Sequence, residues 1–275
     1  MQPPQGHLDS DLREIRLSAV WRYAPTRPIG LPGGFGEVFE GYAEDGSAVA
    51  VKKIRVATPG LATGEIRVAK HLMTSHPDHV IPILDAGFDL LTAERFIVMP
   101  RAELSLQELL DSGGALSDPE AMTILEDVLL ALTEIGDIVH GDLKPANVLR
   151  HDGRWKLADM GIARLAAELP VVSEDRLFAT EAYAAPEQWR FEPATAATDI
   201  YAFGCLAYAV LTGAPPFPGP TQADYCAQHL EESPRALTAA PAVQTLIGRC
   251  LSKTASARPS AEAALDSLRL AWRRA

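Results

Sequence analysis

The pattern of apolar and polar positions changes character well before the middle of the chain. Up to about residue 103, the apolar residues form short runs bounded by turns, at residues 37–42, 48–54 and 95–99. Alternating or short buried runs of this length predict β-strands. Residues 64–74 instead carry apolar positions three to four apart, which predicts one helix. The first part of the chain is therefore expected to be a small sheet accompanied by a helix.

From Leu104 onward the apolar spacing is mainly helical. It predicts long helices over residues 118–136, 197–212, 240–252 and 260–272. The most apolar run, Ile200–Leu211, is too short to cross a bilayer and is expected to be a buried helix. A strand-rich part followed by a helical part predicts an α+β fold with two lobes.

Residues 1–20 differ from the rest of the chain. They are polar and proline-containing at first and mildly amphipathic afterwards, which predicts a tail or a short docking helix. They lack the basic start and apolar run of a secretory signal. The fold is expected to occupy residues 21–275, with a smaller lobe over about 21–99 and a larger lobe over about 104–275.

Composition narrows the classes of function. With 275 residues, of which 47% are apolar, the chain can bury a sizeable core. Its formal net charge of −11 argues against general affinity for nucleic acids, which requires basic patches. The acidity is compatible with basic protein partners. Cys205, Cys226 and Cys250 form no closely spaced even set, so we expect reduced packing thiols in a cytoplasmic protein.

One short stretch carries the most chemistry. Asp142, Lys144 and Asn147 lie within six residues, and Asp159 follows twelve residues after Asn147. This set suits phosphoryl transfer, in which the protein places a base beside the attacking hydroxyl and neutralises the charge on the phosphates. Asp142 can be the base, and Lys144 can reach the transferring phosphate. Asn147 and Asp159 are oxygen ligands of the kind that Mg²⁺ takes.

This stretch resembles the catalytic loop and metal-binding motif of the eukaryotic-type (Hanks-type) serine/threonine protein kinases. Lysine two residues after the base is typical of the serine/threonine rather than the tyrosine members. The chain departs from the family pattern at Gly141, where an arginine is usual, and at Met160, where phenylalanine is usual. His140 and Met160 are expected to pack beneath the site. The alanine-rich composition suggests a bacterial member of the family.

A glycine-rich stretch and a following lysine extend the resemblance. The family's phosphate-covering loop is matched, with its first glycine displaced, by Gly30, Leu31, Gly33, Gly34, Phe35, Gly36 and Val38. Glycines let backbone N–H groups approach phosphate oxygens. Lys52 lies in a run built for burial and therefore needs an anionic partner. The resemblance implies the α- and β-phosphates and a glutamate, for which Glu65 is the candidate.

The residues that would contact adenine are also implied by the resemblance. Met99 corresponds to the gatekeeper, and Ala50, Leu149 and Val38 would be the apolar walls. Because Pro100 has no N–H, Ala102 is expected to supply the donor in the connection between the lobes. The implied cofactors are ATP and Mg²⁺, with Mn²⁺ able to replace it. The implied partners are proteins that carry serine or threonine, including further copies of this chain.

Three further residues match the substrate-binding part of the family. Thr180 corresponds to the threonine that hydrogen-bonds the catalytic aspartate and lysine. Glu187 would be buried and paired with Arg258, and Asp199 would hold the catalytic loop through backbone N–H groups. All of these matches occur in the family's order between Gly30 and Arg258.

Two other functions remain open from the sequence. His-Gly-Asp also resembles the aminoglycoside and choline phosphotransferases, which share the two-lobe fold and act on small molecules. Lys144, Thr180 and Arg258 favour a protein substrate. A nucleotide-binding pseudokinase would have lost one of the catalytic residues, and all are present. Because Gly141 cannot pair with a phosphate, we also expect activity without phosphorylation of the activation segment at Ser173.

Overall fold

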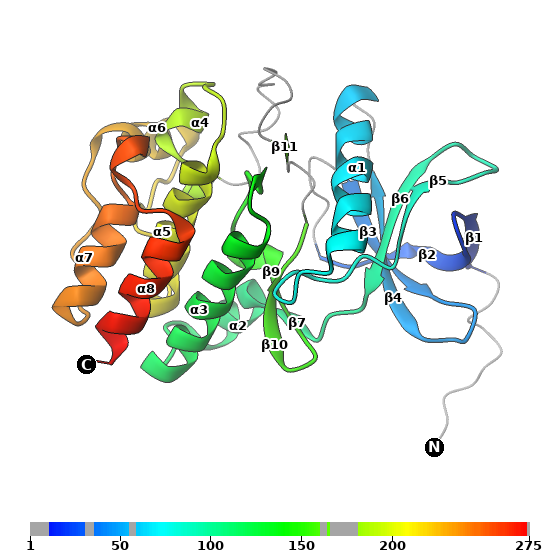
Figure 1. Cartoon of the computed structure of the whole chain (residues 1–275), viewed down its shortest axis with the longest axis horizontal. Helices are drawn as coiled ribbons and strands as arrows, with labels where there is room; N and C mark the ends of the chain where they lie inside the picture. Colours follow the sequence, from blue (N-terminus) through cyan, green and yellow to red (C-terminus); the bar gives the residue numbers. More distant parts are fainter. Residues whose placement is uncertain (1–10, 31–35, 55–58, 160–163, 166–180, 274–275) are drawn as a thin grey trace. The chain divides into compact units, whose positions relative to one another are not determined.

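The computed structural model describes residues 11–30, 36–54, 59–159, 164–165 and 181–273. It divides into two compact units. The first unit comprises residues 1–76 and 81–102, and the second comprises residues 77–80 and 103–275. The strand-rich and helical parts expected from the hydrophobic pattern correspond to these units (Figure 1).

The first unit is built on one antiparallel sheet with the strand order β1-β2-β3-β4-β6-β5. Its strands are β1 (Arg13–Arg16), β2 (Val20–Pro28), β3 (Gly36–Tyr42), β4 (Ala48–Ile54), β5 (Asp85–Phe88) and β6 (Arg95–Pro100). The helix α1 (Pro59–Ser75) packs beside β5 and β6 (Figure 1). The predicted strands and helix of this part are confirmed, with ends that differ by a few residues.

The prediction of a short helix within residues 1–20 is wrong for residues 11–20, the part of this range that the structure describes. Arg13–Arg16 forms the strand β1, which pairs antiparallel with residues 20–23 of β2. Ile15 is its one buried residue and belongs to an apolar cluster with Tyr23, Phe39 and neighbouring strands. A single buried position among exposed ones suits an edge strand, which explains why the mild amphipathicity did not produce a helix.

The second unit is mainly helical. Its helices are α2 (Leu106–Gly113), α3 (Asp118–Glu134), α4 (Pro186–Trp189), α5 (Ala196–Thr212), α6 (Gln222–Glu231), α7 (Pro241–Cys250) and α8 (Ala261–Trp272). Short 3₁₀ turns are η1 (Pro145–Asn147), η3 (Glu181–Tyr183) and η4 (Ala255–Ala257). Small sheets are formed by β7 (Leu104–Ser105), β9 (Val148–His151) and β10 (Arg154–Leu157), and by β8 (Ile138–Val139) with β11 (Arg164–Leu165). The four long helices expected from periodicity are present.

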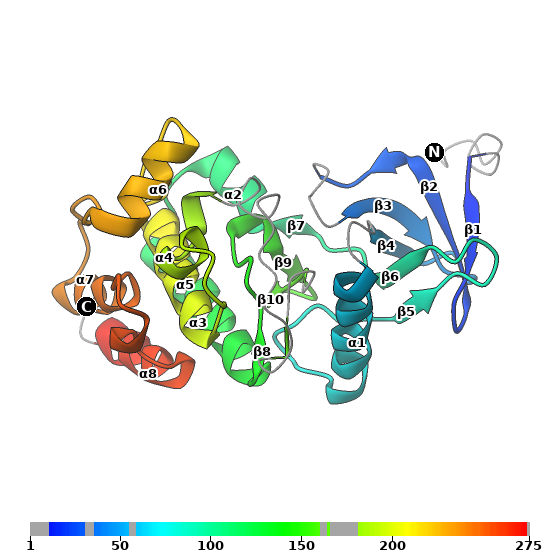
Figure 2. The same cartoon turned by 90° about the horizontal axis from the view of Figure 1, so that it is seen from above.

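The helix α5 is the centre of this unit. Thirteen of its residues are buried, as the apolar run predicted, and it contacts α3 and α7. Figure 2 shows α5 among the other helices of the unit. Gly204 allows the close approach of α7, because a Cβ there would lie 2.9 Å from the Cβ of Cys250. Cys205 and Cys250 are buried free thiols, as expected from their spacing.

No helix among the described residues has the length and apolar character needed to span a bilayer.

Candidate active site

Strand β4 places Lys52 in the interior of the first unit. The residue is 3% exposed, and its Nζ donates a hydrogen bond of 2.7 Å to Oε1 of Glu65 on α1. The pairing expected from the sequence is therefore present. Because alternate residues of a strand face opposite sides, Lys53 points away from Lys52 and pairs with Glu94 at 2.6 Å.

The register of the sheet brings the predicted nucleotide-contacting residues to the face of Lys52. Val38 on β3 lies opposite Lys52, and Met99 on β6 lies opposite Ala50. Since residues 50 and 52 share one face of β4, these four side chains occupy the same face. Ala50 and Met99 are both buried. The opposite face carries the apolar cluster that includes Phe39 and Val51.

The glycine-rich stretch is described only at its two ends. Gly30 has a φ of +71°, in the left-handed region that glycine adopts without strain. Gly36 lies so close to β4 that a Cβ would be 2.4 Å from the carbonyl oxygen of Lys53. Leu31, Gly33, Gly34 and Phe35 lie outside the described residues. The two described glycines are thus required by the backbone of the hairpin.

The catalytic loop follows β8 in the second unit, and its side chains contact one another. Nζ of Lys144 donates to Oδ2 of Asp142 at 2.8 Å, and Asp142 is 9% exposed. Nδ2 of Asn147 donates to the backbone carbonyl of Asp142 at 2.8 Å. Because this bond uses the amide nitrogen of Asn147, its Oδ1 is the atom suited to a cation. The loop thus presents a carboxylate, an ammonium group and an amide oxygen together.

Asp159 is positioned through the residue before it. The backbone N–H of Ala158 donates to the carbonyl of Asn147 at 2.8 Å, which ties the end of β10 to the catalytic loop. Asp159 itself has a φ of +59°, a conformation uncommon for residues other than glycine. Such a conformation is held by the surrounding structure and is often found at functional sites. The second predicted metal ligand therefore follows directly after a residue bonded to the first.

His140 does more than the packing expected for it. It is completely buried, and its Nε2 lies 2.9 Å from the carbonyl oxygen of Ala158. Its Nδ1 accepts the backbone N–H of Asp142 at 3.2 Å. These contacts assign the proton to Nε2 of a neutral imidazole. His140 thus links the residue before Asp159 to the predicted base.

Asp199, near the start of α5, holds the catalytic loop as expected. Its carboxylate oxygens accept the backbone N–H groups of His140 and Gly141, each at 2.8 Å. Burial raises the pKa of Asp199, although the hydrogen bonds from these two N–H groups oppose the rise. Gly141 has a φ of +75°, which glycine accepts readily.

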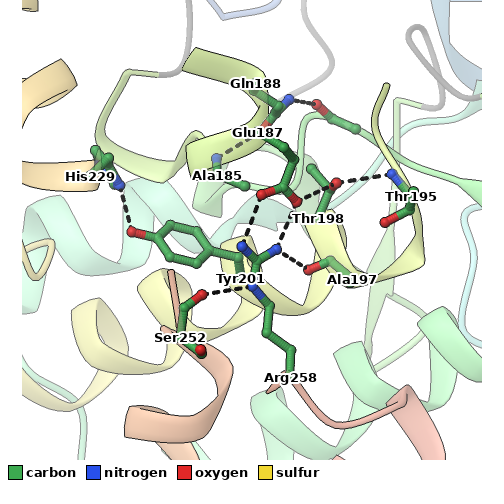
Figure 3. A network of polar contacts seen from close by, with 11 residues as sticks. Ala185, Glu187, Gln188, Thr195, Ala197, Thr198, Tyr201, His229, Ser252 and Arg258 are labelled. Atoms are coloured by element: carbon green, nitrogen blue, oxygen red, sulfur yellow. Dashed lines mark hydrogen bonds and ion pairs between the residues drawn. The ribbon is translucent and has the colours of Figure 1, made fainter. Parts of the chain in front are cut away.

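Glu187 and Arg258 form the buried pair expected from the sequence (Figure 3). The guanidinium donates from Nη1 and Nη2 to the two carboxylate oxygens at 2.7 and 2.8 Å. It also donates to the carbonyls of Ala197 and Ser252, and the hydroxyl of Thr198 donates to Glu187. Burial alone would raise the pKa of Glu187, but the hydrogen bonds and charge of Arg258 lower it below its ordinary value.

For some predicted site residues the structure gives no placement, or gives burial without a contact that bears on adenine. Thr180, Met160 and Ser173 lie outside the described residues. Leu149, on β9, and Ala102, after β6, are half-buried. Their predicted contacts with adenine therefore remain predictions.

Sequence reasoning missed Gln188, the third residue of α4. Its Nε2 donates to the carbonyl of Gly141 at 2.9 Å, next to the predicted base. A glutamine at this position of a helix can be read as half of a capping box, which predicts a bond to the backbone at the helix start. Nothing in the local sequence indicates its bond to a residue 47 positions away.

Comparison with known proteins agrees with this geometry. Residues 23–268 match the family model of the protein kinase domain. Because the match covers most of the chain, the chain belongs to the protein kinase family. The two-lobe α+β fold and the Hanks-type kinase domain expected from the motifs are thereby confirmed.

Named relatives come from several bacteria. The chain is 35% identical over 227 residues to the probable serine/threonine-protein kinase PknB of Corynebacterium glutamicum, covering 78% of this chain and 35% of the relative. It is 33% identical over 268 residues to the serine/threonine-protein kinase pkn2 of Myxococcus xanthus, covering 90% of this chain and 32% of the relative. It is 37% identical over 172 residues to the serine/threonine-protein kinase PkaA of Streptomyces coelicolor, covering 60% of this chain and 32% of the relative. The chain thus spans about a third of the length of these relatives.

Proposed function

We propose that this chain transfers the γ-phosphate of ATP to serine and threonine hydroxyls of proteins. The observation that carries the proposal is the catalytic loop, in which Lys144 and Asn147 both bond Asp142. The relatives named as serine/threonine-protein kinases support it. The family as a whole uses ATP and a divalent metal ion.

Asp142 is proposed as the base that accepts the proton of the substrate hydroxyl. Its hydrogen bond to Lys144 places a cation beside the carboxylate, where charge develops as the phosphoryl group is transferred. Lys144 can neutralise the transferring γ-phosphate from this position. Thr180 is proposed to bond both residues when substrate is present. Lys52, oriented by Glu65, is proposed to hold the α- and β-phosphates.

The predicted metal ligands fit Mg²⁺. Oδ1 of Asn147 and the carboxylate of Asp159 are hard oxygen donors, and the contacts of Ala158 bring their backbones together. A bound Mg²⁺ would supply positive charge to the phosphate oxygens. We propose Mg²⁺ as the working metal, with Mn²⁺ as a substitute, because small hard cations prefer such oxygen sites.

The substrate that receives the phosphate distinguishes three functions of this site: protein kinase, small-molecule phosphotransferase and pseudokinase. The purified chain is incubated with labelled ATP and Mg²⁺, and transfer is measured to itself, to a histone mixture and to aminoglycosides or choline. Label on serine or threonine of protein is expected. Label on the small alcohols alone would favour a small-molecule phosphotransferase. Nucleotide-dependent thermal stabilisation without any transfer would favour a pseudokinase.

Regulation is proposed to differ from that of relatives with arginine before the base. Gly141 has no side chain to pair with a phosphate on the activation segment. We therefore expect Ser173→Ala to retain activity close to that of the wild type. Loss of activity in this variant, together with phosphate on Ser173 of the active protein, would overturn the idea.

A further inference from the structure

The side chain of Gln188 joins two segments of the second unit that are distant in sequence. Its Oε1 accepts the backbone N–H of Ala185 at 2.9 Å, at the start of α4 (Figure 3). Its Nε2 donates to the carbonyl of Gly141 at 2.9 Å. One end of the amide therefore belongs to the end of the proposed substrate-binding segment, and the other to the catalytic loop.

The chemistry of the two contacts fixes the orientation of the amide. The oxygen faces an N–H donor and the nitrogen faces a carbonyl acceptor. A flipped amide would oppose donor to donor and acceptor to acceptor, so both bonds would be lost. Gln188 consequently acts as a bridge of defined length between Ala185 and Gly141.

The bridge acts on the residue next to the proposed base. The N–H of Gly141 donates to Asp199 at 2.8 Å, and the N–H of Asp142 donates to His140 at 3.2 Å. The first bond holds the loop from α5, and the second is made within the loop itself. The carbonyl of Gly141, which belongs to the same peptide group as the N–H of Asp142, is held by Gln188 instead. The peptide that leads into Asp142 is therefore held at both of its polar groups.

We propose that Gln188 is a positioning residue that sets the catalytic base Asp142 against the substrate-binding segment ending at Glu187. The inference rests on the proposed protein kinase activity and extends it to a residue that does not touch the reacting groups. The glycine at position 141 accepts a φ of +75° without a Cβ penalty, and its carbonyl accepts the bond from the glutamine. The bridge consists of neutral groups and requires no phosphate.

The test compares substitutions of Gln188 with the same substitutions of Gln244. Gln244 also lies near the start of a helix and donates from Nε2 to a backbone carbonyl, that of Ala239 at 2.7 Å. It is on α7, and among the described residues its side chain donates no hydrogen bond to the catalytic loop or the substrate-binding segment. Each glutamine is changed to methionine and to glutamate, and kcat and both KM values are measured with histones and ATP.

Gln188→Met keeps the length of the side chain and removes both bonds. We expect kcat to fall about tenfold, since one net hydrogen bond corresponds to about this factor in rate. The KM for ATP should remain within about twofold of the wild type, because the nucleotide residues are unchanged. Gln244→Met should leave both constants unchanged.

Gln188→Glu separates positioning from a purely structural role. A glutamate can still accept the N–H of Ala185, but its ionised form opposes the carbonyl of Gly141 with a second acceptor. The protonated form can donate again. The ratio of variant to wild-type kcat should therefore rise as the pH is lowered from about 8 to about 5.5, as a carboxyl beside an acceptor takes up a proton. Gln244→Glu should show a flat ratio.

The outcomes distinguish this inference from the proposed function. An active wild type with Gln188 variants that match the Gln244 controls in kcat and pH profile would overturn the positioning role alone. If Gln188→Met is unstable, the pH-dependent recovery of Gln188→Glu still decides the question. Absence of transfer by the wild type would overturn the proposed function as well.

Discussion

Removing the cation from the Glu187–Arg258 pair should be strongly destabilising. Both partners are buried, and in Arg258→Met the carboxylate of Glu187 would keep the hydroxyl of Thr198 but lose both guanidinium bonds. An uncompensated buried charge of this kind costs about 3–5 kcal/mol, a large part of the roughly 5–15 kcal/mol that stabilises a typical domain. For a chain of this size, the melting temperature should fall by roughly 6–20 °C.

A surface pair provides the matched control. Arg269 contacts Glu126 at the same distance of 2.7 Å, but their side chains are 42% and 30% exposed. Arg269→Met should therefore cost only about 0–1 kcal/mol. The free energy of unfolding is measured by urea titration with tryptophan fluorescence, for which Trp189, close in sequence to Glu187, is a buried reporter.

A double variant shows whether the buried charge is the cause. In Glu187→Gln/Arg258→Met the charge is removed together with its partner, so part of the lost stability should return. The reasoning would be refuted if Arg258→Met and Arg269→Met were equally mild. It would also be refuted if the double variant were less stable than Arg258→Met.

Two further predictions concern stability. Burial, with the charge of Lys253, lowers the pKa of His229 to about 3, so His229 stays neutral in the folded protein while the unfolded chain takes up a proton below about pH 6.5. Stability is thus lost as the pH falls through this window, by about 2 kcal/mol between pH 7 and pH 5. Urea titrations at the two pH values should therefore show a loss of unfolding free energy that is smaller by about 2 kcal/mol in His229→Gln than in the wild type. An equal loss in the two proteins would contradict the assignment. Gly204→Ala places a Cβ 2.9 Å from that of Cys250 and should cost about 1–3 kcal/mol by overpacking. Gly248→Ala meets no atom within 4 Å and should stabilise its helix by about 0.5–1 kcal/mol, so equal thermal shifts in the two variants would argue against the packing account.

The catalytic loop could be predicted because its chemistry is local in sequence. Asp142, Lys144 and Asn147 are close enough along the chain that their spacing alone brings them together. That Lys52 needs an anionic partner followed from its place in a buried strand, whereas the choice of Glu65 as that partner came from the resemblance to the kinase family.

The features that the sequence did not indicate depend on tertiary contacts. The bridge from Gln188 to Gly141 spans 47 positions, and a glutamine at a helix start is ordinary by itself. Strand β1 shows no strand pattern in the sequence, because its pairing with β2 leaves only Ile15 buried. The contact between Nε2 of His140 and Ala158 likewise depends on the hairpin of β9 and β10, after which Ala158 lies. Hydrophobic periodicity predicts which residues are buried, but not which groups their side chains contact.

The most direct test of the proposed function compares the wild type with Asp142→Asn. Asparagine keeps the shape of the side chain but cannot accept the proton of the substrate hydroxyl. Transfer of labelled phosphate from ATP·Mg²⁺ to histone serine and threonine is followed, and nucleotide binding is measured by calorimetry on the same samples. The account predicts that the variant loses transfer while binding nucleotide with nearly unchanged affinity. Turnover close to that of the wild type in Asp142→Asn would contradict it.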